Sequence, residues 1–92
     1  MQIEVVDGRD KGNVMLYALS TCGWCAKTKE LLKSLGVKYS YLYVDKVGPD
    51  EQEQVVKEIE RFNPHLSFPT LVIGNDHVIV GFREDEIRKE LA

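Results

Sequence analysis

The sequence predicts one α/β domain, residues 1–92, with a central four-stranded mixed sheet flanked by three helices. Short apolar runs alternate with segments of helical periodicity in the order strand, helix, strand, helix, strand, strand, helix. The chain has 92 residues, of which 43% are hydrophobic, and this suffices for one compact core but not for two separate ones. We therefore expect a single layered domain.

The first half of the chain predicts a strand, a helix and a parallel strand. Residues 14–19 are apolar on both alternating faces, which is typical of a strand buried between helices. From Gly23 the pattern becomes helical, and Gly36 fits the end of that helix. Residues 39–44 alternate again, with three tyrosines on one face. The intervening helix is long enough for a parallel crossover between the two strands.

The second half predicts a helix, a hairpin and a last helix. Asp50 and Glu53 resemble a capping box at the start of a helix that ends at Asn63-Pro64. Residues 70–73 and 78–80, joined by a turn, are typical of an antiparallel hairpin. A last amphipathic helix begins near Glu84.

The N-terminal segment bears on the number of strands, and the overall charge limits the classes of binding partner. Residues 3–8 are compatible with a further edge strand. With 12 basic and 15 acidic side chains, the net charge of -3 provides no basic surface for nucleic acid or for an anionic membrane. The sequence contains neither a secretory signal pattern nor a long apolar run. We therefore expect a cytoplasmic monomer with no nucleic-acid or membrane partner.

The two cysteines, Cys22 and Cys25, are the principal candidate functional residues. A bridge between them would close so short a loop that it would constrain the unfolded chain very little, which argues against a purely structural disulfide. A tetrahedral metal site would need two more ligands, and His65 and His77 are spaced unlike those of a zinc finger. We expect these histidines to be solvated and expect no metal site.

The placement of the cysteines predicts redox chemistry. Cys22 follows a buried strand at the start of a helix, where unpaired amide groups and the helix dipole favour a thiolate. The thiolate is the nucleophile of disulfide exchange, so Cys22 is predicted to attack. Cys25, almost one helical turn later, is predicted to be more buried and to resolve the mixed disulfide.

With these residues placed, the chain resembles the glutaredoxin family from about Asn13 to its C-terminus, which implies a thioredoxin-like fold. The segment Cys22-Gly23-Trp24-Cys25 is similar to the dithiol motif of that family, and Ser67-Phe68-Pro69-Thr70 is similar to its cis-proline segment. The segment Gly81-Phe82-Arg83-Glu84-Asp85 resembles the redoxins that supply electrons to ribonucleotide reductase. The resemblance implies thiol-disulfide oxidoreductase activity.

The resemblance also implies a set of substrate-binding residues. A cis peptide before Pro69 would turn the backbone of Phe68 toward the sulfurs and leave it free to pair with an extended substrate, whereas the alternative is an ordinary trans proline that opens an edge strand. We expect Trp24 to be partly exposed and to form an apolar docking patch with Phe68. The full implied set is Trp24, Phe68, Pro69, Thr70, Gly81, Phe82 and Asp85.

Departures from the family pattern bear on the reductant. Glutathione-using members commonly carry a lysine where this chain has Leu19, and a Gly-Gly pair where it has Gly81-Phe82, although Asp85 keeps the family's acidic residue. We therefore expect no prosthetic group and expect a flavin- or ferredoxin-linked disulfide reductase to replace glutathione as reductant. Protein disulfides are the expected substrates, ribonucleotide reductase among them.

Two other functions remain open from the sequence. One is a module in which two copies of the chain share an iron-sulfur cluster through their cysteines, as some relatives do with glutathione; the intact pair and the altered glutathione contacts argue against it. The other is a redox-inactive adaptor, against which the intact pair also argues.

Overall fold

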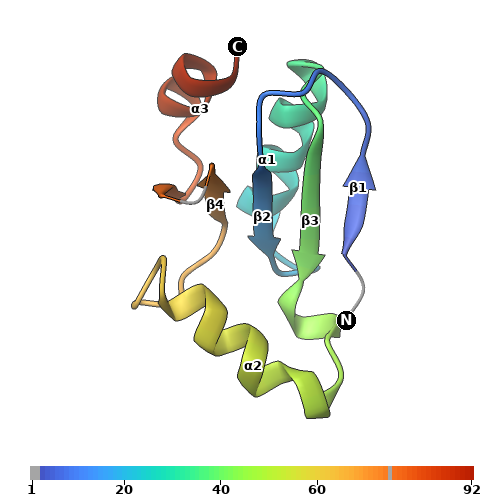
Figure 1. Cartoon of the computed structure of the whole chain (residues 1–92), viewed down its shortest axis with the longest axis vertical. Helices are drawn as coiled ribbons and strands as arrows, with labels where there is room; N and C mark the ends of the chain where they lie inside the picture. Colours follow the sequence, from blue (N-terminus) through green and yellow to red (C-terminus); the bar gives the residue numbers. More distant parts are fainter. Residues whose placement is uncertain (1–2, 75) are drawn as a thin grey trace.

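The computed structural model describes residues 3–74 and 76–92 and contains a five-stranded mixed sheet with three α-helices (Figure 1). In chain order the elements are β1 Glu4–Val6, β2 Val14–Ala18, α1 Gly23–Ser34, β3 Tyr39–Tyr43, the 3-10 helix η1 Val44–Lys46, α2 Pro49–Glu60, β4 Thr70–Ile73, β5 His77–Val80 and α3 Glu84–Leu91. The predicted order of strands and helices is confirmed, and the N-terminal segment forms the additional edge strand.

The strands lie in the order β1-β3-β2-β4-β5. β2 and β3 run parallel, whereas β1 with β3, β2 with β4 and β4 with β5 run antiparallel. Ala18 at the end of β2 is opposite Tyr43 at the end of β3. Because parallel strands end at the same edge of a sheet, the segments that follow β2 and β3 begin side by side (Figure 1).

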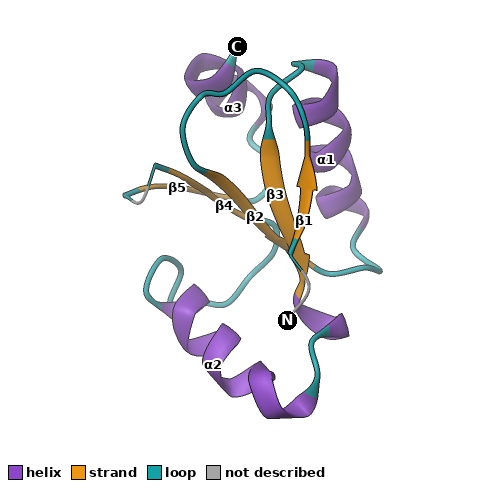
Figure 2. Cartoon of the chain, turned by 45° about the vertical axis from the view of Figure 1, so that its right-hand side comes forward, coloured by secondary structure: helices purple, strands orange, loops and turns teal. Residues whose placement is uncertain are grey.

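The helices cover the sheet from both sides (Figure 2). α1 and α3 pack on one face, where Leu32 and Ile87 are fully buried against Leu16 and Leu71. α2 packs on the other face, where Val55 and Ile59 join a second apolar cluster. The β2 run is apolar on both sides because its residues contribute to both clusters, as the sequence predicts.

The end of α1 shows why a glycine stands at position 36. Gly36 has φ +68, a left-handed conformation that glycine adopts without a steric penalty. Its N–H donates to Lys33 O at 3.0 Å, and the Val37 N–H donates to Leu32 O at 3.3 Å. This pair of bonds is the Schellman arrangement, which satisfies the last helical carbonyls.

The predicted start of α2 is wrong. The helix begins at Pro49 with Gly48 as its N-cap, and no side chain caps it, so Asp50 and Glu53 do not form a capping box. Proline suits the first helical position because its fixed φ matches the helix and its missing N–H would have no partner there. Asp50 lies instead within the first turn, where its charge complements the helix dipole.

The end of α2 differs from the sequence prediction. α2 ends at Glu60, before the predicted Asn63-Pro64 boundary, and the N–H groups of both Phe62 and Asn63 donate to Ile59 O beyond that end. Within the described part of the chain, none of the helices combines the length and the apolarity that a membrane span requires.

Candidate active site

Cys22 is the residue that caps the start of α1. It has an extended backbone (φ -93, ψ 117), and α1 begins at the next residue, Gly23. Its Sγ accepts a hydrogen bond from the backbone N–H of Cys25 at 3.2 Å. The sulfur thus occupies the position where a serine or aspartate oxygen usually satisfies an unpaired amide of the first turn. A hydrogen-bond donor and the positive end of the helix both favour negative charge on this atom.

Cys25 differs sharply from Cys22 in its environment. The Cys25 side chain is 1% exposed, whereas Cys22 is only partly buried, and both cysteines are free thiols. Burial, and after it the hydrogen bond with the Cys22 side chain, raises the pKa of Cys25 to about 12. The buried sulfur therefore holds its proton at neutral pH, so the structure divides the pair into an accessible sulfur and a protonated, protected one.

The turn before Cys22 is anchored by Asp45, a residue that the sequence analysis did not single out. The Ser20 N–H donates to Asp45 Oδ1 at 2.9 Å, and the Ser20 hydroxyl donates to Asp45 Oδ2. These two bonds lower the pKa of the Asp45 carboxyl. The Cys22 N–H closes the turn by donating to Leu19 O at 3.2 Å.

The peptide bond between Phe68 and Pro69 is cis, as the resemblance implied. Pro69 is buried, and its carbonyl oxygen accepts a hydrogen bond from the Gly81 N–H at 2.9 Å. Gly81 has φ +85, a conformation that favours glycine at this turn. The structure therefore brings together two of the predicted segments, the cis-proline segment and the segment that leads into α3.

Thr70 is held inside the protein. It is fully buried at the start of β4, and its hydroxyl donates to Ser67 O at 2.7 Å. The hydroxyl also accepts from Asn63 Nδ2 at 3.0 Å, and Asn63 donates to Ser67 O at 3.0 Å. In the sequence Asn63 resembles only a helix boundary, whereas in the structure its buried amide organises the loop before Phe68 and Pro69.

Trp24 is exposed between the two cysteines of the sequence, as predicted, and its ring contacts Phe82. Its side chain is 58% exposed and stacks on Phe82, with ring centroids 5.7 Å apart and an interplanar angle of 25°. Lys27 Nζ lies 5.3 Å from the centre of the same ring. Phe68 is partly buried and packs against both apolar clusters, and its predicted docking patch with Trp24 stays a prediction. Asp85 lies exposed in the first turn of α3.

One histidine, His65, lies in the loop after α2, and the other, His77, lies at the start of β5. His65 is exposed, and His77 Nε2 lies 3.2 Å from Glu86 Oε2. Across residues 3–74 and 76–92, no group of three or more His, Cys, Asp or Glu side chains is placed to hold a metal ion.

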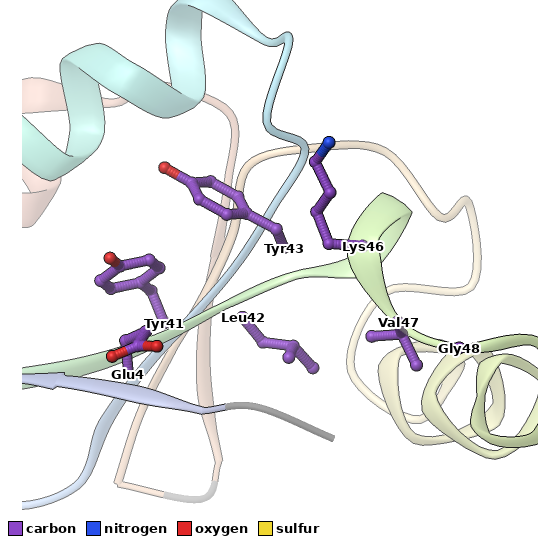
Figure 3. Close-up of a pocket in the computed structure, with 7 residues that line it drawn as sticks. All are labelled: Glu4, Tyr41, Leu42, Tyr43, Lys46, Val47 and Gly48. Atoms are coloured by element: carbon purple, nitrogen blue, oxygen red, sulfur yellow. The ribbon is translucent and has the colours of Figure 1, made fainter.

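A pocket of about 490 Å³ opens near the end of β3 (Figure 3). Tyr41 and Tyr43 point to one side of the strand there and Leu42 to the other, as the sequence pattern predicts. Lys29 Nζ donates to the Tyr43 hydroxyl at 2.7 Å and lies 3.9 Å from the centre of the Tyr41 ring. The lining of the pocket contains neither cysteine, so its volume does not describe the redox site.

A dithiol pair at the start of a helix that packs on a mixed sheet defines a thiol-disulfide redox protein with the thioredoxin-like fold. A profile of the glutaredoxin family matches residues 14–78. This chain belongs to the glutaredoxin family, as one of its dithiol members.

The similar proteins include one known sequence and two solved structures. A glutaredoxin-like protein in the rubredoxin operon of Clostridium pasteurianum is 35% identical over 83% of this chain and 93% of its own length. The glutaredoxin of Methanosarcina mazei Go1 is 50% identical, with a TM-score of 0.90 over 100% of this chain and 89% of that one. Methanosarcina acetivorans methanoredoxin is 46% identical, with a TM-score of 0.88 over 92% of this chain and 90% of that one.

Proposed function

We propose that this protein is an electron carrier that reduces protein disulfides through a Cys22/Cys25 cycle. The Cys22 thiolate attacks one sulfur of a substrate disulfide, and the other substrate sulfur leaves as a thiolate that takes up a proton. Cys25 then gives up its proton and attacks Cys22 Sγ, which releases the second substrate thiol. Two electrons pass to the substrate, and Cys22 and Cys25 are left joined as a disulfide.

The observation that supports this cycle is the difference between the two sulfurs. Cys22 is partly exposed at the start of α1 and its Sγ accepts a hydrogen bond from the Cys25 N–H, whereas Cys25 is buried. An exchange that always begins at the same sulfur needs one sulfur that a substrate can reach and a second that reacts only within the protein. Burial of Cys25 limits its reaction to the mixed disulfide that forms one helical turn away.

The surface beside Cys22 suits a protein substrate. The stacked rings of Trp24 and Phe82 present an exposed apolar contact of the kind that is enriched in protein interfaces. The nearby Phe68-Pro69 peptide precedes β4, and in this proposal the backbone of Phe68 pairs with an extended substrate segment. Ribonucleotide reductase is a candidate substrate because the segment from Gly81 to Asp85 resembles that of the redoxins that serve it.

A disulfide reductase is the proposed source of electrons. Leu19 replaces the lysine common in glutathione-using members, and Phe82 replaces the second glycine of their Gly-Gly pair. Phe82 places an aromatic ring against Trp24, where glycine would leave open space. The relative from a rubredoxin operon and the relative named methanoredoxin also favour redox proteins as partners. In this proposal the protein is a monomer in the cytoplasm, and a flavin- or ferredoxin-linked reductase reduces the disulfide between Cys22 and Cys25.

A comparison of three reductants tests the proposal. The oxidised protein is mixed separately with glutathione, with a flavin-linked disulfide reductase and with a ferredoxin-linked one, and free thiols are counted over time. We expect one of the reductases to reduce the disulfide at least about tenfold faster than glutathione at equal electron supply. Faster reduction by glutathione would overturn the assignment of the reductant. The absence of any redox cycle with dithiothreitol would overturn the function itself.

A further inference from the structure

Asp45 is joined to the segment that carries Cys22 although the two follow different strands. Ala18 and Tyr43 are opposite each other in the parallel pair β2 and β3, and Ser20 and Asp45 each follow two residues later. The shared strand direction therefore brings them together at the sheet edge where α1 begins. Both oxygens of the Asp45 carboxylate accept hydrogen bonds from Ser20, one from its N–H and one from its hydroxyl.

The anchored segment is short. Only Thr21 separates Ser20 from Cys22, and the Cys22 N–H closes the turn on Leu19 O. Fixing Ser20 therefore restricts how Cys22 can move relative to the first turn of α1. An anionic acceptor makes stronger hydrogen bonds than a neutral one, so the carboxylate suits this task.

We propose that Asp45 is a positioning residue of the redox pair. It holds the turn before Cys22, and its negative charge keeps the Cys22/Cys25 couple reducing. The inference rests on the thiol-disulfide cycle proposed above. In that cycle the oxidised pair is neutral, whereas the reduced pair attacks as the Cys22 thiolate. A carboxylate nearby opposes that added negative charge, so it disfavours the reduced state and makes the pair a better electron donor.

The charges around the cysteine pair agree with a carboxylate that disfavours the reduced state. The negative charge of Asp45 also raises the pKa of Cys25, as the smallest of its causes, after burial, the hydrogen bond with Cys22 and the charge of Cys22. Lys46, the next residue, offsets part of that charge and helps to lower the pKa of Asp45 itself. Because Asp45 is exposed, dissolved salt screens its field. The charge contribution is therefore expected to shrink at high ionic strength, whereas the hydrogen bonds persist.

Three variants separate charge from anchoring. Asp45→Asn removes the charge but keeps an oxygen that can accept the Ser20 N–H. Ser20→Ala removes the hydroxyl bond but keeps the charge of Asp45. Glu60→Gln removes an exposed charge at the end of α2 and serves as the matched control, since it leaves the Ser20 turn intact. Thermal unfolding of each variant confirms that it is folded.

The test measures the redox equilibrium between the protein and dithiothreitol at two salt concentrations, about 20 mM and about 1 M. For Asp45→Asn we expect the equilibrium constant for reduction of the protein disulfide to rise about two- to tenfold at low salt and to return toward wild type at high salt. Ser20→Ala and Glu60→Gln should stay within about twofold of wild type. Ser20→Ala should slow attack on a protein disulfide because it removes one of the two bonds that hold the turn. Asp45→Asn should slow it as well, because a neutral amide oxygen accepts the Ser20 N–H more weakly than a carboxylate does.

The outcomes distinguish this inference from the function on which it rests. A wild-type protein that cycles normally, with Asp45→Asn unchanged in both equilibrium and rate, would overturn the role of Asp45 and leave the function standing. An equal shift in Glu60→Gln would show a general charge effect and would also overturn it. A wild-type protein that does not exchange with dithiothreitol would instead refute the proposed function.

Discussion

The backbone N–H of Cys25 donates a hydrogen bond to Sγ of Cys22 at 3.2 Å, so the residue that is proposed to resolve the mixed disulfide also stabilises the sulfur that forms it. This bond lies in the first turn of α1, so the helix start holds both cysteines in place. The 1% exposure of Cys25 then determines which sulfur a substrate can reach. This asymmetry between the two sulfurs has consequences that experiments can measure.

Replacing each cysteine by serine should give different products. Cys25→Ser keeps the attacking sulfur but removes the resolving one, so we expect a stable mixed disulfide with a protein substrate. Cys22→Ser should lower the reduction rate at least about 100-fold, because a buried thiol cannot replace the lost nucleophile. Mass spectrometry of the intact adduct and an assay of substrate thiols measure the two effects. Equal activities in the two variants would contradict the assigned roles.

Alkylation should separate the two thiols over a wide range of pH. Because the pKa of Cys25 is raised to about 12 by its burial and its hydrogen bond with Cys22, only about 1% of it is thiolate at pH 10. With iodoacetamide at about pH 8, we expect modification of Cys22 first and of Cys25 only as the pH approaches about 12. Peptide mapping after timed quenching measures both sites.

Unfolding provides the control for that experiment. In concentrated urea the burial of Cys25 is lost and its thiol ionises in the ordinary range, so both cysteines should react at similar rates. Native protein in which Cys25 reacts as fast as Cys22 near neutral pH would show that the buried thiol is not protected.

The sequence predicted the features that depend on local patterns. Period-two and helical spacing located the strands and helices, and Gly36 marked the end of α1 because only the local backbone decides where a left-handed residue is needed. The cysteines and Pro69 were found because their motifs are short and contiguous. The start of α2 was predicted wrongly because the proline rule and the capping-box rule compete within a few residues, and Pro49 prevailed.

The features that the sequence analysis missed depend on contacts between distant segments. The Ser20–Asp45 pair requires the register of β2 and β3, which a single sequence does not specify. The stacking of Trp24 on Phe82 depends on the turn that joins β5 to α3. A hydrogen bond from the Gly81 N–H to the Pro69 carbonyl holds this turn beside Pro69. Asn63 resembled a helix terminator because its burial becomes apparent only once the loop before Pro69 is folded.

Trp24 should matter for protein substrates and not for small disulfides. Trp24 is 58% exposed and its ring is stacked on Phe82, so a docking protein can cover it. An aromatic contact contributes about 0.5–1.5 kcal/mol beyond the buried area, so Trp24→Ala should lower kcat/KM for a protein disulfide about two- to tenfold. A small aromatic disulfide that reacts directly with Cys22 serves as the control and should be affected less than about twofold. An equal loss with both substrates would show that Trp24 acts on the chemistry of the pair and not on docking.

Asn63 should support both stability and the position of the segment before Pro69. Its side chain is 3% exposed, and Nδ2 donates to Ser67 O and Thr70 Oγ1, both at 3.0 Å. Asn63→Ala leaves these buried acceptors with fewer donors, so we expect a loss of about 1–3 kcal/mol in the free energy of unfolding. Urea unfolding of the reduced protein measures it.

A nearby control variant tests whether the effect of Asn63 comes from its buried amide. His65 is exposed, and His65→Ala keeps the backbone N–H that donates to Asn63 Oδ1 at 3.2 Å, so it should change stability by less than about 0.5 kcal/mol. If the loop before Pro69 helps to dock substrates, Asn63→Ala should also raise KM for a protein disulfide under conditions where the variant is fully folded. Wild-type stability in Asn63→Ala would mean that the loop keeps its conformation without this amide, and the network between Asn63, Ser67 and Thr70 would then have no structural role.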